Sequence, residues 1–107
     1  MSLYVYLGWF FAGAFLTNAL PHIVQGVSGN RFQTPFARPR GVGESSAIAN
    51  VIWGFFNLAV GIALLYLCLP QLPPPWPLAA TALIGGLIMG LVLAWRFGTV
   101  RNAPPHP

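Results

Sequence analysis

The sequence predicts an all-α membrane protein, a three-transmembrane-helix bundle with a long ordered cytoplasmic connection between helices 1 and 2. Three apolar stretches, at residues 3–20, 47–69 and 78–97, each approach the roughly 20 residues that cross a hydrocarbon core. Only 6% of the residues are charged, against about 25% in soluble domains, and the mean hydropathy is +0.69. Such a chain has too little polar surface for a water-soluble fold, so residues 1–107 are expected to form one integral membrane domain.

The first span is expected at residues 3–20, as a helix that stays in the mature protein. No Lys or Arg precedes it, whereas a cleavable signal peptide begins with positive charge. Pro21 either ends this helix or kinks it, because proline lacks the amide hydrogen and restricts the residue before it. With a kink, the helix would reach about Gly26.

The predicted connection, residues 21–46, is far longer than a usual turn between helices. Its prolines and glycines exclude a regular helix over residues 29–43, but several apolar side chains lie among them. We therefore expect an ordered segment that lies on the bilayer surface or folds against the helix ends.

The second helix is expected to begin near Ser45 and Ser46, because serine is a preferred residue at a helix N-terminus, and to end before Pro70. A proline-stiffened turn at residues 70–77 leads into the third helix. A polar, proline-rich tail is expected at residues 98–107.

All the basic side chains are predicted to lie on one side of the membrane. With three spans, the N-terminus and the turn at residues 70–77 share a side that has no Lys or Arg. The connection and the C-terminal end share the other side, and basic residues mark the cytoplasmic face. We therefore expect a multi-pass protein of the bacterial inner membrane, with its N-terminus outside and its C-terminus in the cytoplasm. The basic residues are Arg31, Arg38, Arg40, Arg96 and Arg101.

Small and amide residues recur along one face of the second helix. Steps of three and four residues keep Asn50, Gly54, Asn57 and Gly61 on that face. Glycine lets helix backbones approach, and asparagine hydrogen-bonds across the contact. Helix packing is the favoured interpretation, and a polar lining for a pore or substrate path is the alternative. The glycines assigned to helix packing are Gly54, Gly61, Gly86 and Gly90.

Asn18 and His22 lie four residues apart near the end of the first helix. Both are expected to brace the connection by hydrogen-bonding the carbonyl groups that Pro21 frees. A proton relay or ligand site is the alternative, because an ionisable side chain at membrane depth is a functional candidate. Together with Asn50 and Asn57 they form the predicted intramembrane polar seam.

The connection is also a candidate site for lipid headgroups or for a phosphate-bearing ligand. Arginine binds phosphate bidentately, and a helix N-terminus carries partial positive charge. Ordinary positive-inside charge is the alternative, worth about 1 kcal/mol per basic residue near an anionic surface. The predicted contact residues are Arg31, Arg38, Arg40, Ser45 and Ser46.

No catalytic residue, metal site or cofactor is expected. The sequence has one acidic residue, and it shows no nucleophile–base pair, paired carboxylates or zinc spacing. The positive charge flanks apolar segments, so it does not indicate nucleic-acid binding. The sequence therefore leans away from an enzyme.

Four motifs resemble a family of small, uncharacterised bacterial integral-membrane proteins. They are Asn18-Ala-Leu-Pro-His22, Gly26-x-x-Gly29, Phe32-x-Thr-Pro-Phe36 and Asn50-Val-Ile-Trp-Gly-Phe-Phe-Asn57. The resemblance covers residues 18–61 and implies a shared design of the first helix end, the connection and the second helix. It implies no substrate.

The leading hypothesis is a non-enzymatic membrane protein that self-associates through its Gly and Asn helix faces and presents the connection to membrane lipids or a phosphate ligand. One alternative is an accessory subunit of a larger membrane complex. Another is a homo-oligomeric channel or transporter, with His22, Asn50 and Asn57 along its path.

Overall fold

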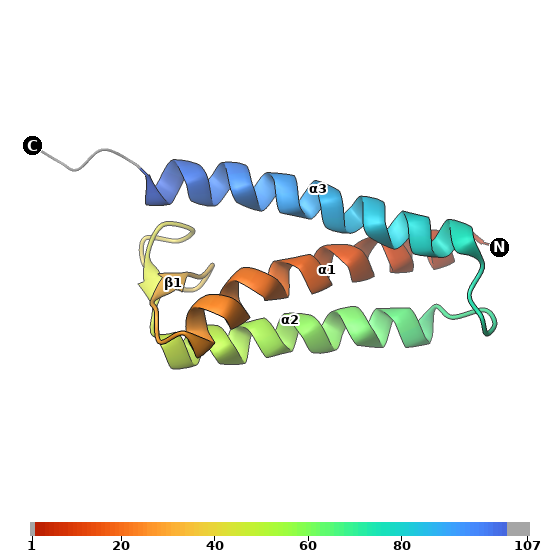
Figure 1. Cartoon of the computed structure of the whole chain (residues 1–107), viewed down its shortest axis with the longest axis horizontal. Coiled ribbons are helices and arrows are strands. Elements are labelled where there is room, and N and C mark those ends of the chain that lie inside the picture. The colour runs from red at the N-terminus through yellow and green to blue at the C-terminus, as the bar shows by residue number, and fades with distance from the viewer. Residues whose placement is uncertain (1, 103–107) are drawn as a thin grey trace, which may run out of the picture.

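The computed structural model describes residues 2–102, and over that range the chain is helical apart from one pair of short strands (Figure 1). Each of the three helices is long and apolar enough to span a membrane, which confirms that part of the predicted fold. The elements are α1 (Leu3–Val27), β1 (Phe32–Gln33), β2 (Glu44–Ser45), α2 (Ala47–Leu67) and α3 (Trp76–Arg101).

The first helix is the centre of the bundle. Figure 1 shows α1 between α2 and α3, and most of the contact between helices is made by α1 with one or the other. The molecule is elongated, with extents of 55 × 24 × 20 Å. Because α2 and α3 each pack mainly on α1, most of their large apolar side chains face outward, as lipid-facing side chains do.

The glycines of α2 let it approach α1 closely. A Cβ atom on Gly54 would lie 2.5 Å from Ile23 Cγ1, and one on Gly61 would lie 2.7 Å from Leu16 Cδ2. Real Cβ atoms do not come this close, so a side chain at either position would force α1 to adjust: at Gly54 the Ile23 backbone nitrogen is also only 2.9 Å away, whereas at Gly61 the side chain of Leu16 would have to move. The small-residue face predicted on α2 is thus turned toward α1 of the same chain.

The contact between α1 and α3 depends on backbone approach at two glycines. A Cβ on Gly13 would overlap the carbonyl oxygen of Ala82, and a Cβ on Gly85 would overlap that of Phe10. A side chain can rotate away from such an overlap, but a helix backbone moves only with its whole helix. The fit between α1 and α3 therefore depends most on Gly13 and Gly85.

The two glycines of α3 that the sequence assigns to packing differ in their surroundings. A Cβ on Gly86 would lie 2.8 Å from Thr17 Oγ1, so this position is close-packed. A Cβ on Gly90 would lie 3.7 Å from Thr17 Cγ2, which is an ordinary van der Waals distance. Gly90 is therefore not needed for close approach, because the two helices are already farther apart there.

The first helix runs through Pro21 and ends at Val27, the continuation that the sequence left open. A glycine ends it: Gly29 has a φ angle of +80°, a conformation that other residues rarely adopt. Its backbone amide donates to the Gly26 carbonyl, and the next amide donates to the Gln25 carbonyl. The additional turns beyond Pro21 carry His22 up to the connection.

The third helix also continues past its predicted end, to Arg101. The tail predicted at residues 98–107 is therefore helical in its first part, and residues 103–107 lie outside the described range. The final turn is held by Thr99 Oγ1, which donates to the Trp95 carbonyl, and by contacts of Arg101 with the connection. These contacts offset the low helix propensity of Gly98.

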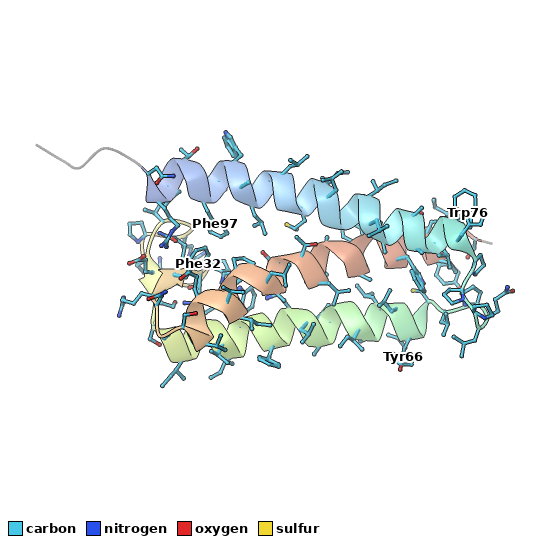
Figure 2. All side chains as sticks on the ribbon, viewed as in Figure 1. Phe32, Tyr66, Trp76 and Phe97 are labelled. Atoms are coloured by element: carbon cyan, nitrogen blue, oxygen red, sulfur yellow. The ribbon has the colours of Figure 1, made fainter. Side chains whose placement is uncertain are left out.

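The connection between α1 and α2 contains the antiparallel strand pair, in which Phe32 lies opposite Ser45. The Phe32 ring is buried and packs edge-on against Phe97 of α3, with ring centroids 4.6 Å apart. The Arg101 guanidinium lies over the same ring at 4.6 Å. Figure 2 shows Phe32 and Phe97 at one end of the bundle and Tyr66 with Trp76 at the other.

Candidate functional site

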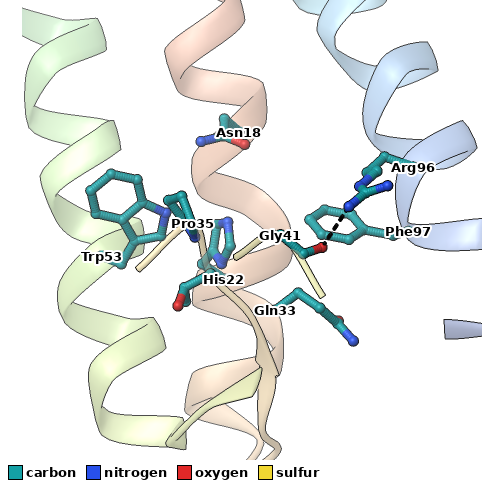
Figure 3. Close-up of a pocket in the computed structure, with 9 residues that line it drawn as sticks. Asn18, His22, Gln33, Pro35, Gly41, Trp53, Arg96 and Phe97 are labelled. Atoms are coloured by element: carbon teal, nitrogen blue, oxygen red, sulfur yellow. Dashed lines mark hydrogen bonds between the residues drawn. The ribbon is translucent and has the colours of Figure 1, made fainter. Parts of the chain in front are cut away.

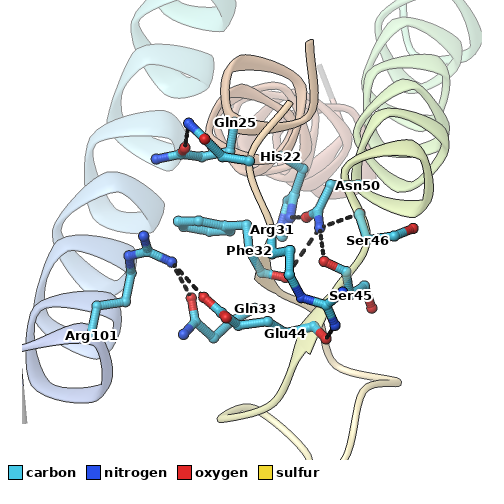
Figure 4. A network of polar contacts seen from close by, with 11 residues as sticks. His22, Gln25, Arg31, Phe32, Gln33, Glu44, Ser45, Ser46, Asn50 and Arg101 are labelled. Atoms are coloured by element: carbon cyan, nitrogen blue, oxygen red, sulfur yellow. Dashed lines mark hydrogen bonds and ion pairs between the residues drawn. The ribbon is translucent and has the colours of Figure 1, made fainter. Parts of the chain in front are cut away.

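A buried pair, His22 and Asn50, joins α1 to α2 at the connection end of the bundle (Figure 4). His22 is 2% exposed and Asn50 is fully buried, and Nδ1 of the ring lies 2.8 Å from Oδ1 of the amide. Both belong to the predicted polar seam, and the structure brings them into direct contact.

The Asn50 amide also holds the connection in place. Its Nδ2 donates to the carbonyl oxygens of Phe32, Ser45 and Ser46, at 3.0 to 3.2 Å. Carbonyl oxygens only accept hydrogen bonds, so this side of the amide must be the NH₂ group. One side chain thus connects β1, β2 and the start of α2.

The orientation of this amide determines the tautomer of His22. Because the Asn50 Nδ2 faces three carbonyls, its Oδ1 must face His22, and an amide oxygen accepts but does not donate. The imidazole hydrogen of the neutral ring is therefore on Nδ1. This leaves Nε2 as a hydrogen-bond acceptor.

The other two members of the seam form a second amide pair. Asn57 Nδ2 donates to the Trp53 carbonyl at 2.8 Å, and its Oδ1 accepts from Asn18 Nδ2 at 2.9 Å. Asn18 and His22 therefore bond to amides of α2, and the prediction that they bond to carbonyls freed by Pro21 is wrong. The seam pairs α1 with α2 because its members face each other across that contact.

Aromatic rings surround His22 on several sides. Phe32, Trp53 and Phe97 all meet its ring edge to face, with centroids 5.5, 6.4 and 6.3 Å away. These rings come from the connection, α2 and α3. They pack around the buried His22–Asn50 pair.

A cavity of about 220 Å³ lies beside His22, between the three helices and the connection (Figure 3). It is smaller than the roughly 300–1,000 Å³ of most pockets for drug-sized ligands. Figure 3 shows side chains from all of these elements around it. The lining residues are Asn18, His22, Gln33, Thr34, Pro35, Gly41, Trp53, Arg96 and Phe97.

Arg96 brings positive charge to the cavity from α3. Its Nη2 donates to the Gly41 carbonyl at 3.2 Å, which fixes the guanidinium against the connection. Gly41 has a φ angle of +75°, and a Cβ there would lie 3.0 Å from the same Nη2. Glycine at this position therefore permits both the turn and the approach of Arg96.

The three arginines of the predicted headgroup site, Arg31, Arg38 and Arg40, are exposed on the connection. Arg31 Nη2 donates to the Glu44 carbonyl at 3.0 Å. Over residues 2–102, the side chains of Arg38 and Arg40 make no hydrogen bond and no ion pair. These three guanidinium groups lie outside the cavity that Arg96 lines.

The two serines of the predicted headgroup site have internal partners. Ser45 Oγ lies 2.5 Å from Thr34 Oγ1, which links the two sides of the connection. Ser46 Oγ accepts from the Ala49 amide and caps α2, as expected of a serine at a helix start. Both hydroxyls therefore serve the internal structure of the connection and the start of α2.

Arg101 ties the end of α3 to the strand pair. Its Nη1 lies 2.9 Å from Gln33 Oε1 and 3.3 Å from a carboxylate oxygen of Glu44. Because Gln33 also lines the cavity, this bond fixes one wall of the cavity to the end of α3.

Sequence reasoning did not assign five of the cavity side chains to the site: Gln33, Thr34, Pro35, Trp53 and Phe97. Arg96 was noted only for its effect on orientation in the membrane. Trp53 and Thr34 do fall within the motifs of the family resemblance, and those motifs were the sequence feature that could have identified them as site residues. Among the described residues, no three His, Cys, Asp or Glu side chains are grouped to hold a metal ion.

Comparison of the chain with protein-family models, with curated proteins and with solved structures finds no match.

Proposed function

We propose that this chain is a non-enzymatic, multi-pass protein of the bacterial inner membrane that binds phosphate-bearing headgroups of anionic lipids at its arginine-bearing end. The N-terminus would face outside, and the connection would face the cytoplasm. The exposure of Arg31, Arg38 and Arg40 together on the connection is the observation that carries this proposal.

The surroundings of these arginines fit a membrane interface. Phe36 and Val42 are also exposed on the connection, at 53% and 46%. Arginine with exposed apolar side chains nearby suits the boundary between headgroups and acyl chains. Arg96 and Arg101 reach the same end of the bundle from α3, which adds to its positive potential. Ser45 and Ser46 are left out of the proposed contact because their hydroxyls are engaged.

Self-association does not form part of the proposal. Gly54 and Gly61 would have carried it, and both are covered by α1 of the same chain. A second copy could use this face only by displacing α1.

Arginine-to-lysine exchange distinguishes a specific headgroup site from general surface charge. The triple variant Arg31→Lys, Arg38→Lys, Arg40→Lys keeps the charge but loses the planar donor pairs that bind phosphate bidentately. We expect it to retain anionic lipid about threefold less than the wild type, and the corresponding triple Gln variant to retain almost none. Retention is measured by native mass spectrometry of the purified protein.

Asn30→Ala, on the same exposed segment and without a charge change, is the matched control and should retain lipid as the wild type does. If the Lys variant equals the wild type and only the Gln variant fails, the arginines contribute charge alone. If the Gln variant also retains lipid, headgroup binding by these residues is refuted.

A further inference from the structure

Two hydrogen-bond donors line the cavity beside His22, one from α2 and one from α3 (Figure 3). Arg96 uses one Nη2 bond to reach Gly41, which leaves other N–H groups of its guanidinium for an occupant. Among the described residues, Trp53 Nε1 is a buried donor with no hydrogen-bond partner. Figure 3 shows this nitrogen on the edge of the indole that faces Pro35 and His22. A buried donor of this kind costs free energy unless it is satisfied.

Acceptors gather on the α1 side. His22 Nδ1 donates to Asn50, so Nε2 of the neutral ring is an acceptor. Asn18 Nδ2 donates to Asn57, so Asn18 Oδ1 is a second acceptor, and both side chains line the cavity. The cavity thus combines a cation and a buried N–H group with two neutral acceptors.

We propose that this cavity binds a phosphate ester that carries free hydroxyl groups, such as phosphoglycerol. The phosphate oxygens would accept hydrogen bonds from Arg96 and from Trp53 Nε1, which compensates the buried indole. The ester hydroxyls would donate to His22 Nε2 and Asn18 Oδ1. A volume of about 220 Å³ suits a group of this size and is too small for a nucleotide. This site is separate from the exposed arginines and does not rest on them.

Such a group can come from a lipid headgroup or from a soluble phosphate ester. Asn18 also lines a second, apolar hollow of about 300 Å³ between α1 and α3, whose walls include Phe15, Ile88 and Val92. A lipid with its headgroup in the cavity would find a place for an acyl chain beside it. A soluble ester would use the polar cavity alone.

The indole N–H resonance of Trp53 reports directly on the proposed contact. We would record ¹⁵N–¹H spectra of the protein in detergent and identify this resonance by its loss in Trp53→Phe. The probes are short-chain phosphatidylglycerol, glycerol 3-phosphate and short-chain phosphatidylcholine, which has a phosphate but no free hydroxyl. We expect a saturable shift with the first two probes, and a stronger affinity for the lipid if the apolar hollow takes part.

Variants separate the cavity from the surface charge. Arg96→Gln should weaken phosphatidylglycerol binding at the cavity about tenfold or more, whereas Asn30→Ala, an exposed change outside the cavity, should leave it unchanged. Trp53→Phe should weaken phosphatidylglycerol binding severalfold. Because this variant lacks the indole resonance, its binding is measured from the backbone amide resonances of Gly41 and Gln33, which line the cavity. Trp95 is exposed, so Trp95→Phe should bind phosphatidylglycerol as the wild type does.

An unshifted Trp53 resonance in the wild type, phosphatidylcholine binding as tightly as phosphatidylglycerol, or a loss of binding in Asn30→Ala equal to that in Arg96→Gln would each overturn the proposal. If Arg96→Gln does not fold, the phosphatidylglycerol affinity of Trp53→Phe tests the proposal, and an affinity equal to that of the wild type would overturn it. The exposed arginines are intact in all of these variants, so loss of cavity binding is distinguishable from loss of binding at the connection.

Discussion

Alanine in place of Gly13 or Gly85 is expected to detach α3 from α1. Each added Cβ would overlap a backbone carbonyl of the facing helix, so the helices must move apart along their contact. We expect a loss of about 3 kcal/mol in stability, at the upper end of the usual cost of overpacking, because no side-chain rotation relieves the overlap. The loss of near-ultraviolet circular dichroism with temperature, recorded in detergent, measures it.

Gly90→Ala is the matched control on the same helix. Its added Cβ would lie 3.7 Å from Thr17 Cγ2, and alanine has the higher helix propensity. We expect this variant to be at least as stable as the wild type. Equal destabilisation by Gly85→Ala and Gly90→Ala would contradict the close approach of α1 and α3.

Leucine in place of Asn50 is expected to release the connection from the helices. The fully buried Asn50 amide donates to the carbonyls of Phe32 and Ser45 and accepts from His22 Nδ1. Leaving these groups unpaired should cost about 3 kcal/mol. Amide hydrogen exchange over residues 28–46 measures the release, because exchange there should rise while the middle of α2 stays protected.

Asn57→Leu provides the comparison. Asn57 makes one hydrogen bond to another helix, with Asn18, and its other bond is to a carbonyl of its own helix. Interhelical hydrogen bonds in membrane proteins average about 0.6 kcal/mol, so a smaller loss is expected and the connection should stay protected. If Asn50→Leu costs no more than Asn57→Leu, Asn50 does not organise the connection.

The spacing of α2 was enough to predict its packing face but not the partner of that face. Asn50, Gly54, Asn57 and Gly61 recur at helical intervals, so the shared face follows from helix geometry alone. Whether α1 or a second copy covers that face depends on contacts between distant segments. The sequence does not encode such contacts as a local pattern, which is why the leading hypothesis from the sequence assigned this face to self-association.

The cavity was harder to predict because its walls come together only after folding. Trp53 and Arg96 lie on different helices, and Gly41 belongs to a segment without helical periodicity. In the sequence, Arg96 was interpreted only as a charge that sets the orientation in the membrane. No local pattern indicated its contact with Gly41, because the two residues lie 55 positions apart. The course of α1 beyond Pro21 mattered as well, since it carries His22 to the connection.

The orientation of the bundle decides whether its arginine-bearing end meets the anionic lipids and phosphate esters of the cytoplasm. Single cysteines placed at opposite ends, in a Cys68→Ser background, test this directly. Leu72→Cys lies in the turn between α2 and α3, and Val42→Cys lies in the connection; both positions are exposed. In intact bacterial cells, a membrane-impermeant maleimide should label Leu72→Cys at once and Val42→Cys only after the inner membrane is permeabilised. Labelling of Val42→Cys in intact cells, with Leu72→Cys protected, would contradict the cytoplasmic placement of the arginines.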